Sequence, residues 1–205
     1  TAVERLVRFS GEFQRIALSA TVRPLDRVAE WVGGLEVRGE GERASYLRRR
    51  VAIVESRVPK RYDLEVRFGG DTADAPGVAA DGVWSWLVAE LKRPLARNRS
   101  TLVFANSRRM VEKVTRLVNE EQPSELVYSH HGSLSREVRA VVEERLKKGE
   151  LRGIVATSSL ELGIDIGALD EVVLVQTPPS LASAVQRIGR AGPAVGETSR
   201  GSFLP

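Results

Sequence analysis

The sequence has 205 residues and a formal net charge of +4, from 31 Lys and Arg against 27 Asp and Glu. This length gives room for one large domain, or for one domain and part of another. The absence of cysteine excludes disulfides and thiolate metal sites, and no apolar run approaches the roughly 18 residues of a membrane span. We therefore expect a cytoplasmic protein with no membrane partner, whose small basic excess permits a polyanionic partner without requiring one.

The start of the chain predicts two helices with a short strand between them. Apolar residues at helical spacing predict helices over residues 1–12 and 25–32. Residues 14–21 predict a strand that ends in small hydroxyl residues, Ser19 and Thr21. Because the chain does not begin with Met, we interpret it as a piece of a longer protein.

The patterns are weakest over residues 35–100. We expect strands over residues 51–54 and 62–68, the second with a clear alternation of apolar and polar side chains. Residues 69–82 are rich in Gly, Asp, Ala and Pro, which is typical of a loop. A helix follows over residues 83–97.

Two features of this region suggest contact with nucleic acid, and each has a plainer alternative. Arg48, Arg49 and Arg50 form a basic run, although a run of charge is usually a solvated face. Trp86 lies off the apolar stripe of its helix, where it is free to stack on a base, although partial burial against another element is the favoured interpretation.

In the second half of the chain, short apolar strands alternate with helices. The strands are predicted over residues 101–105, 126–129, 153–156 and 171–176, and another begins at residues 202–204. Continuous apolar strands are typical of a parallel sheet that helices cover on both faces. The sequence therefore predicts an α/β fold with a mostly parallel sheet.

Polar residues follow these strands at the points where the strands end. They are Asn106, Ser107, Arg108, Gly132, Thr157 and Ser158. In open α/β sheets, ligands bind at the carboxyl ends of the strands, and backbone N–H groups at the start of a helix form a natural phosphate site. The alternative for Asn106 or Ser107 is a simple helix cap, and both interpretations are compatible.

Two groups of titratable residues are discounted as metal sites. His130 and His131 are adjacent on an extended chain, so their side chains point in opposite directions. Asp170 and Glu171 precede their strand, which places their carboxylates at the wrong end of the sheet for a magnesium site. We predict that the chain has no metal site of its own.

Two blocks near the end of the chain carry the most specific pattern. Residues 158–165 read Ser-Ser-Leu-Glu-Leu-Gly-Ile-Asp, and residues 186–192 read Gln-Arg-Ile-Gly-Arg-Ala-Gly. Arg187 and Arg190 are three residues apart, so on a helix they share a face. Arginines aimed across a cleft at a phosphate form the arginine-finger arrangement, whereas the alternative is a surface helix with two solvated arginines.

These two blocks resemble motifs V and VI of superfamily-2 helicases, and they are most similar to the large helicase-related (Lhr) branch. The tripeptide Ser19-Ala20-Thr21 resembles motif III, and residues 106–109 resemble motif IV. The resemblance implies a RecA-like fold. It also implies that residues 1–45 are the remnant of a first RecA-like domain and that residues 46–205 form the second.

The resemblance also implies roles for individual residues. Arg187 and Arg190 would be catalytic and reach the phosphates of ATP. The residues expected beside ATP are Gly163, Asp165 and Gln186. The residues expected on the nucleic-acid strand are Asn106, Ser107, Arg108, Gly132, Thr157 and Ser158. Ser19 and Thr21 would couple the nucleotide state to strand binding.

Two groups of an ATPase are missing from the sequence. It contains no G-x-x-x-x-G-K-[ST] phosphate loop and no D-E-x-H or D-E-x-D box after a strand. ATP and Mg²⁺ are therefore expected as cofactors whose ligands come mainly from the first RecA-like domain, and the chain alone is not expected to hydrolyse ATP. Pro193 replaces a third basic residue that many motif VI sequences carry, which leaves at most two arginine fingers.

The expected function is that of the second motor domain of an ATP-dependent DNA helicase or translocase, because Lhr-type proteins are DNA translocases. The expected partners are the first RecA-like domain of the same parent chain and nucleic acid, with single-stranded DNA favoured over RNA. The alternatives are a motor domain of an RNA helicase or a remodelling enzyme of the same superfamily, and a non-catalytic helicase-like binding module.

Overall fold

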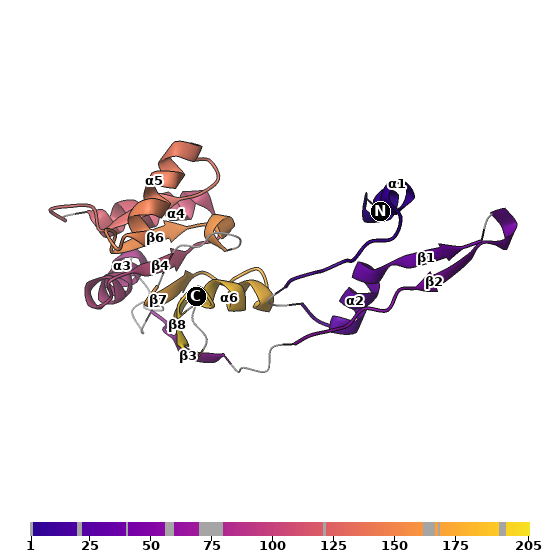
Figure 1. Ribbon diagram of the computed structural model, residues 1–205. Helices are drawn as coiled ribbons and strands as arrows, with labels where there is room; N and C mark the ends of the chain where they lie inside the picture. The colour runs from indigo at the N-terminus through magenta and orange to yellow at the C-terminus, as the bar shows by residue number, and fades with distance from the viewer. Residues whose placement is uncertain are drawn as a thin grey trace. The chain divides into compact units, whose positions relative to one another are not determined.

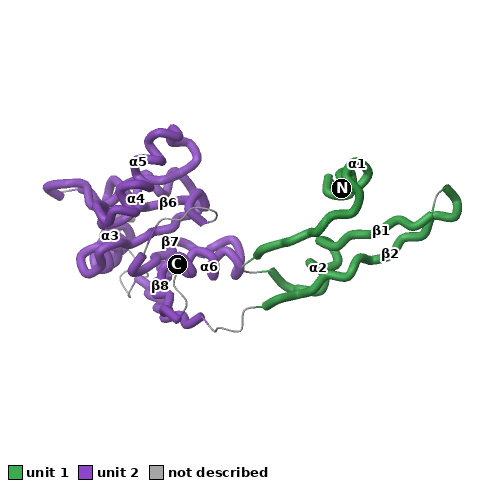
Figure 2. The backbone as a smooth tube through the Cα atoms, viewed as in Figure 1, with its two compact units in different colours: residues 1–57 green, residues 58–205 purple. Residues whose placement is uncertain are grey.

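The chain folds into two compact units, Thr1–Arg57 and Val58–Pro205, which Figure 2 shows in green and purple. The computed structural model describes residues 2–19, 22–39, 41–55, 60–69, 80–120, 122–161, 167, 169–192 and 196–205. The predicted assignment of residues 1–45 to a preceding domain stays a prediction.

The first unit contains two helices and a hairpin. Its elements are α1 (Ala2–Ser10), α2 (Leu25–Gly33), β1 (Leu35–Arg38), the 3₁₀ turn η1 (Gly41–Arg43) and β2 (Ser45–Arg48) (Figure 1). The two predicted helices are confirmed. The strand predicted over residues 14–21 is wrong over its described part, residues 14–19, and the strand predicted over residues 51–54 is wrong, because no strand forms there. The antiparallel pair β1–β2 was not predicted. Ala20 and Thr21 lie outside the described residues.

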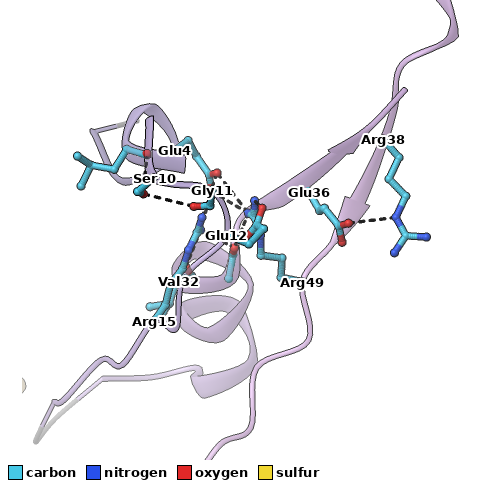
Figure 3. Close-up of polar contacts among 11 residues, drawn as sticks. Glu4, Ser10, Gly11, Glu12, Arg15, Val32, Glu36, Arg38 and Arg49 are labelled. Carbon is cyan, nitrogen blue, oxygen red and sulfur yellow. Dashed lines mark hydrogen bonds and ion pairs between the residues drawn. The ribbon is translucent and has the colours of Figure 1, made fainter. Parts of the chain in front are cut away.

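Two arginines hold the first unit together. Arg15 Nη1 donates to Glu4 Oε1 and to the carbonyl oxygen of Gly33, both at 2.7 Å. Arg49 Nη2 donates to Glu12 Oε1 at 2.6 Å, and its Nη1 donates to the same Gly33 oxygen at 3.0 Å; Figure 3 shows both guanidinium groups pointing toward the acids. The hydrogen bond from Arg15 lowers the pKa of Glu4 to about 2. Arg49 is therefore neither a solvated charge nor a free nucleic-acid contact.

The second unit is a parallel sheet with helices. Its elements are β3 (Arg61–Val66), α3 (Ala80–Arg97), β4 (Thr101–Phe104), α4 (Arg108–Asn119), β5 (Val127–His130), α5 (Arg136–Lys147), β6 (Gly153–Ala156), the 3₁₀ turn η2 (Ser158–Leu160), β7 (Glu171–Val175), α6 (Leu181–Ile188) and β8 (Thr198–Leu204). The strand order is β3-β8-β7-β4-β6-β5, and every neighbouring pair is parallel. The predicted α/β fold with a mostly parallel sheet is confirmed.

Alternate residues of the buried strands face two separate cores. Val103 packs with the apolar side chains of α3 and α4, whereas Leu102 and Phe104 pack with those of α5 and α6. Helices therefore cover both faces, which explains why the central strands are apolar without interruption. Trp86 is partly buried and packs against the α3–α4 side, as the favoured interpretation predicts.

Serine residues cap three of the helices that follow strands. Ser107, Ser135 and Ser180 each accept a hydrogen bond from the backbone N–H three residues later, at 3.1–3.3 Å. Each cap satisfies one of the free N–H groups at a helix start. These caps fix the residues at which α4, α5 and α6 begin.

The edge of the sheet differs from the prediction. β8 begins at Thr198 instead of residue 202, and it lies between β3 and β7. All six residues of β3 are exposed, although their alternation predicts one buried face. β3 is the edge strand of the sheet, and its pairing with β8 gives it strand structure without burial.

The acidic pair lies at the amino end of β7, as predicted. Asp170 Oδ2 accepts from the backbone N–H groups of residues 99 and 100, and Glu171 is 2% exposed. The Glu171 carboxylate accepts from Arg97 (2.6 Å), Asn98 (2.8 Å) and Ser202 (2.6 Å). Its position shows a structural role. None of the described helices is both long enough and apolar enough to cross a membrane.

We predict that Glu171→Gln lowers the free energy of unfolding by about 1–3 kcal/mol near neutral pH, because three hydrogen-bond donors lose a charged acceptor that is buried. Burial alone raises the pKa of Glu171, but hydrogen bonds from Ser202, Arg97 and Asn98 bring it below its usual value of 4.5. The carboxylate therefore stabilises the fold above about pH 4.5, and this contribution is lost as the pH falls below it. Urea unfolding measures both effects. Glu150→Gln, on an exposed carboxylate, is the control and should change stability by less than about 0.5 kcal/mol.

Candidate nucleotide and nucleic-acid site

The predicted site residues follow the carboxyl ends of adjacent strands. Phe104, at the end of β4, is level with Ala156 of β6 and Leu174 of β7, and His130 of β5 is level with Ala156. The segments that follow these strands therefore meet at one edge of the sheet, where open α/β sheets bind ligands. The sequence placed these residues correctly relative to the strands.

Arg187 lies at this edge but is buried. Its side chain is 3% exposed, its Nε donates to Glu161 Oε2 at 2.9 Å, and its Nη1 donates to Asn106 Oδ1 at 3.2 Å. The guanidinium carbon also lies 5.1 Å from the centre of the Phe104 ring. These contacts join α6 to the ends of β4 and β6, so the alternative of a solvated surface arginine does not apply to Arg187.

Arg190 also donates hydrogen bonds to Glu161. Its Nε and Nη2 donate to the backbone carbonyl oxygen of Glu161, at 3.1 and 2.6 Å. The N–H of Arg190 donates to the carbonyl oxygen of Arg187 at 3.1 Å, which extends α6 by a tight turn. Arg190 is half-buried, unlike Arg187. Sequence reasoning assigned no role to Glu161, whose only signal was its place inside the first of the two blocks.

Asn106 joins β4 to β7. Its side-chain Nδ2 donates to the carbonyl oxygen of Thr177 at 2.7 Å, and its backbone N–H donates to Gln176 Oε1 at 3.4 Å. Its Oδ1 accepts from Arg187. The amide side chain of Asn106 thus connects three segments of the edge.

The segments after β4 and β5 meet through a hydrogen bond. Arg108 Nη1 donates to Ser133 Oγ at 3.0 Å, and both side chains are exposed. Ser107 caps α4, so the cap interpretation is confirmed without excluding a phosphate role for its neighbours. Gly132 is exposed, and no atom lies within 4 Å of the place that a Cβ would take, which leaves its backbone open to a ligand.

A chain of hydrogen bonds runs inward from the segment after β6. Thr157 Oγ1 donates to Ser159 Oγ at 3.3 Å, Ser159 Oγ lies 2.8 Å from His130 Nδ1, and His130 Nε2 lies 2.9 Å from Glu143 Oε1. Burial lowers the pKa of His130, against the opposing effect of Glu143. Ser159 Oγ also donates to the backbone carbonyl oxygen of His130 at 3.0 Å, which ties the segment after β6 to the end of β5. Ser158 is exposed beside this chain.

Residues 84–194 match the family of the helicase conserved C-terminal domain, over more than half of the chain. The chain belongs to this helicase family. It is 42% identical over 205 residues to the ATP-dependent helicase Lhr-Core protein 2 of Thermococcus barophilus, and this match covers 99% of the chain and 23% of that relative. It is 39% identical over 223 residues to the Lhr helicase/uracil glycosylase of Escherichia coli, which covers 94% of the chain and 14% of that relative. These relatives place it in the Lhr branch of superfamily 2.

Solved helicases share the fold. The structure of the Mycobacterium smegmatis helicase Lhr bound to ssDNA and AMP-PNP is similar over 100% of this chain and 26% of its own, with 41% identity and a TM-score of 0.81. The Dbp5 helicase of S. cerevisiae, at 20% identity and a TM-score of 0.57 over 71% of this chain and 35% of its own, shares the fold alone. The expected RecA-like fold is confirmed. The helicase domain described here spans about a quarter or less of the length of its Lhr relatives.

Some of the predicted site residues lie outside the described part of the chain. Gly163, Asp165 and Pro193 lie outside the described residues, as does Thr21. Gln186 is half-buried on α6 next to Arg187. Ser19 is exposed in the first unit, so its predicted coupling role stays a prediction.

The histidine pair of the helicase domain behaves as the sequence predicts. His130 contacts Glu143 on α5, whereas His131 Nε2 lies 2.5 Å from Glu112 on α4, on the other face of the sheet. Over the part of the chain that the structure describes, no group of three or more His, Cys, Asp or Glu residues is arranged to hold a metal ion.

We predict that His130→Asn reduces the sensitivity of this domain to mild acid. Because the lowered pKa of His130 disfavours its proton in the folded state, the unfolded chain takes up that proton first, and stability falls as the pH drops below about 6.5. The variant lacks this titration. Urea unfolding between about pH 7 and about pH 5 measures the slope. Equal slopes for the two proteins would contradict the assignment.

Proposed function

We propose that this chain supplies the second RecA-like motor domain of an Lhr-type, ATP-dependent DNA helicase, with residues 1–45 as the end of the preceding RecA-like domain. The observation that carries the proposal is the meeting of Arg187 and Arg190 with Glu161 at the carboxyl edge of the parallel sheet. The Lhr relative of known structure was solved with single-stranded DNA and an ATP analogue, AMP-PNP, which supports both proposed ligands. The expected cytoplasmic location stays a prediction that rests on the cysteine-free composition.

In this proposal, Arg190 is the arginine finger. A guanidinium group neutralises the charge that develops on the transferring γ-phosphoryl group, and Arg190 is the less buried of the two arginines. The internal contacts of Arg187 favour a role in positioning over direct contact with phosphate. The phosphate loop and the Mg²⁺ ligands come from the first RecA-like domain of the parent. Gly163, Asp165 and Gln186 are proposed to lie beside ATP, as the resemblance implies.

The strand-binding half of the proposal uses the segments after β4, β5 and β6. Their exposed N–H and hydroxyl groups and one guanidinium suit phosphate oxygens, which only accept hydrogen bonds. The residues are Asn106, Ser107, Arg108, Gly132, Thr157 and Ser158, and their contacts would carry little sequence preference. Arg108 and Ser158 are exposed and accessible to a phosphate. Asn106 and Thr157 already donate hydrogen bonds within the protein, so a phosphate would have to share or replace those bonds.

We predict that the purified 205-residue chain does not turn over ATP but binds single-stranded DNA weakly, with less affinity for single-stranded RNA. The sequence lacks the lysine and the carboxylates that activate the nucleotide. A phosphate-release assay and fluorescence anisotropy with labelled oligonucleotides test this. Turnover by the isolated chain would contradict the division of the ATP site between two domains.

We predict that Arg190→Ala in the full-length parent reduces strand-stimulated ATP hydrolysis by at least about 10³-fold, as for other arginine fingers. Affinity for single-stranded DNA should stay within about twofold, because Arg190 is not among the proposed strand contacts. Loss of both properties together would favour a role of Arg190 in folding.

We predict that Arg108→Ala weakens binding of single-stranded DNA by about fivefold and lowers the slope of log affinity against log salt by about one. Arg116→Ala is the matched control, because Arg116 is an exposed arginine near the other end of α4. Equal losses for the two variants would show that Arg108 contributes only general charge.

A further inference from the structure

Glu161 contacts both arginines of the second block. Its carboxylate accepts from Arg187 Nε at 2.9 Å, and its backbone carbonyl accepts from Arg190 at 2.6 Å. The Glu161 side chain is 13% exposed and that of Arg187 is 3% exposed, so this ion pair is shielded from water. A shielded pair that is also hydrogen-bonded has a fixed geometry, because breaking it would leave a buried charge without a partner.

The two contacts are not independent. The ion pair with Arg187 fixes where the chain lies at residue 161, and the carbonyl oxygen of the same residue then meets Arg190. Arg187 is bound in turn to Asn106, at the end of β4. Glu161 therefore sets the position of the Arg190 guanidinium in the absence of a nucleotide.

Glu161 also ends the segment that is proposed to hold the strand. Its backbone N–H donates to the carbonyl oxygen of Ser158 at 3.0 Å, which closes η2 into one turn. The N–H of Thr157 donates to the carbonyl oxygen of His130 at 3.2 Å, which ties the start of this segment to the end of β5. A phosphate bound at Thr157 or Ser158 would thus move or fix the same turn whose last carbonyl oxygen, that of Glu161, accepts from Arg190.

We propose that Glu161 is a positioning residue that couples strand contact to the placement of Arg190. Glu161 touches neither ATP nor the strand in this proposal. It joins the turn after β6, which responds to the strand, to the arginine that responds to the nucleotide. The proposal rests on the proposed function, since it requires Arg190 to act on ATP.

The test uses the full-length helicase and measures the ratio of ATP hydrolysis with and without single-stranded DNA. We expect Glu161→Ala to lower this ratio by about tenfold, with the KM for ATP and the Kd for single-stranded DNA each within about twofold of wild type. Glu161→Gln should lower it less, because the amide oxygen still accepts from Arg187. A merely structural defect would reduce both rates in proportion and leave the ratio unchanged.

Two further variants make the result specific. Glu150→Gln, an exposed carboxylate on the loop after α5, should leave the ratio unchanged. If Glu161 acts through Arg187, the double variant Glu161→Ala/Arg187→Ala should show about the same ratio as the Arg187→Ala variant alone. A double variant whose ratio falls by the product of the two single effects would overturn this route.

The outcomes separate this inference from the proposed function. If Arg190→Ala abolishes hydrolysis but both Glu161 variants keep the wild-type ratio, the coupling role is wrong and the motor function stands. If Arg190→Ala hydrolyses ATP like wild type, the proposed function itself fails. If Glu161→Ala does not fold, Glu161→Gln decides, and a wild-type ratio in that variant overturns the coupling role.

Discussion

A guanidinium group that water cannot reach is stable only where other groups meet its charge and its N–H donors, and Arg187 is such a group. Its partners come from three places: the carboxylate of Glu161 after β6, the amide oxygen of Asn106 after β4, and the ring of Phe104. These contacts of Arg187 hold α6 against the carboxyl ends of β4 and β6. The place of Arg190, one turn further along, follows from it.

At the amino ends of the strands, a buried carboxylate likewise needs partners for its charge. Glu171 is buried at the start of β7, and its two oxygens accept hydrogen bonds from Arg97, Asn98 and Ser202. These contacts tie α3 and β8 to the sheet and serve stability. At the carboxyl edge, by contrast, Ser158 stays exposed beside the buried network. Because the strands are parallel, all their amino ends lie on one side of the sheet and all their carboxyl ends on the other. The contacts of Glu171 at the amino ends stabilise the fold, whereas the carboxyl ends are open to ligands.

The sequence predicted elements well where burial alone specifies them. Strands such as Thr101–Phe104 and Glu171–Val175 are apolar runs that helices cover on both faces, so their pattern is local. The errors fall where a strand depends on a partner. Residues 14–19 have strand composition but form no strand, whereas the polar start of β8, residues 198–200, pairs with β3. Pairing is a property of two segments, and one segment does not encode it.

For the candidate site, the sequence by itself determined which residues follow each strand and offered Ser107 as a helix cap, because both depend on neighbours within a few positions. It also carried the family resemblance. Only the tertiary structure decided the partners of Arg187, which lie 26 and 81 residues away at Glu161 and Asn106. Such contacts arise when the carboxyl ends of β4 and β6 are brought level, and strand register is set by the whole sheet. For that reason the spacing of Arg187 and Arg190 predicted a shared helix face. It did not predict that Arg187 is buried or that Arg190 donates to a backbone carbonyl oxygen.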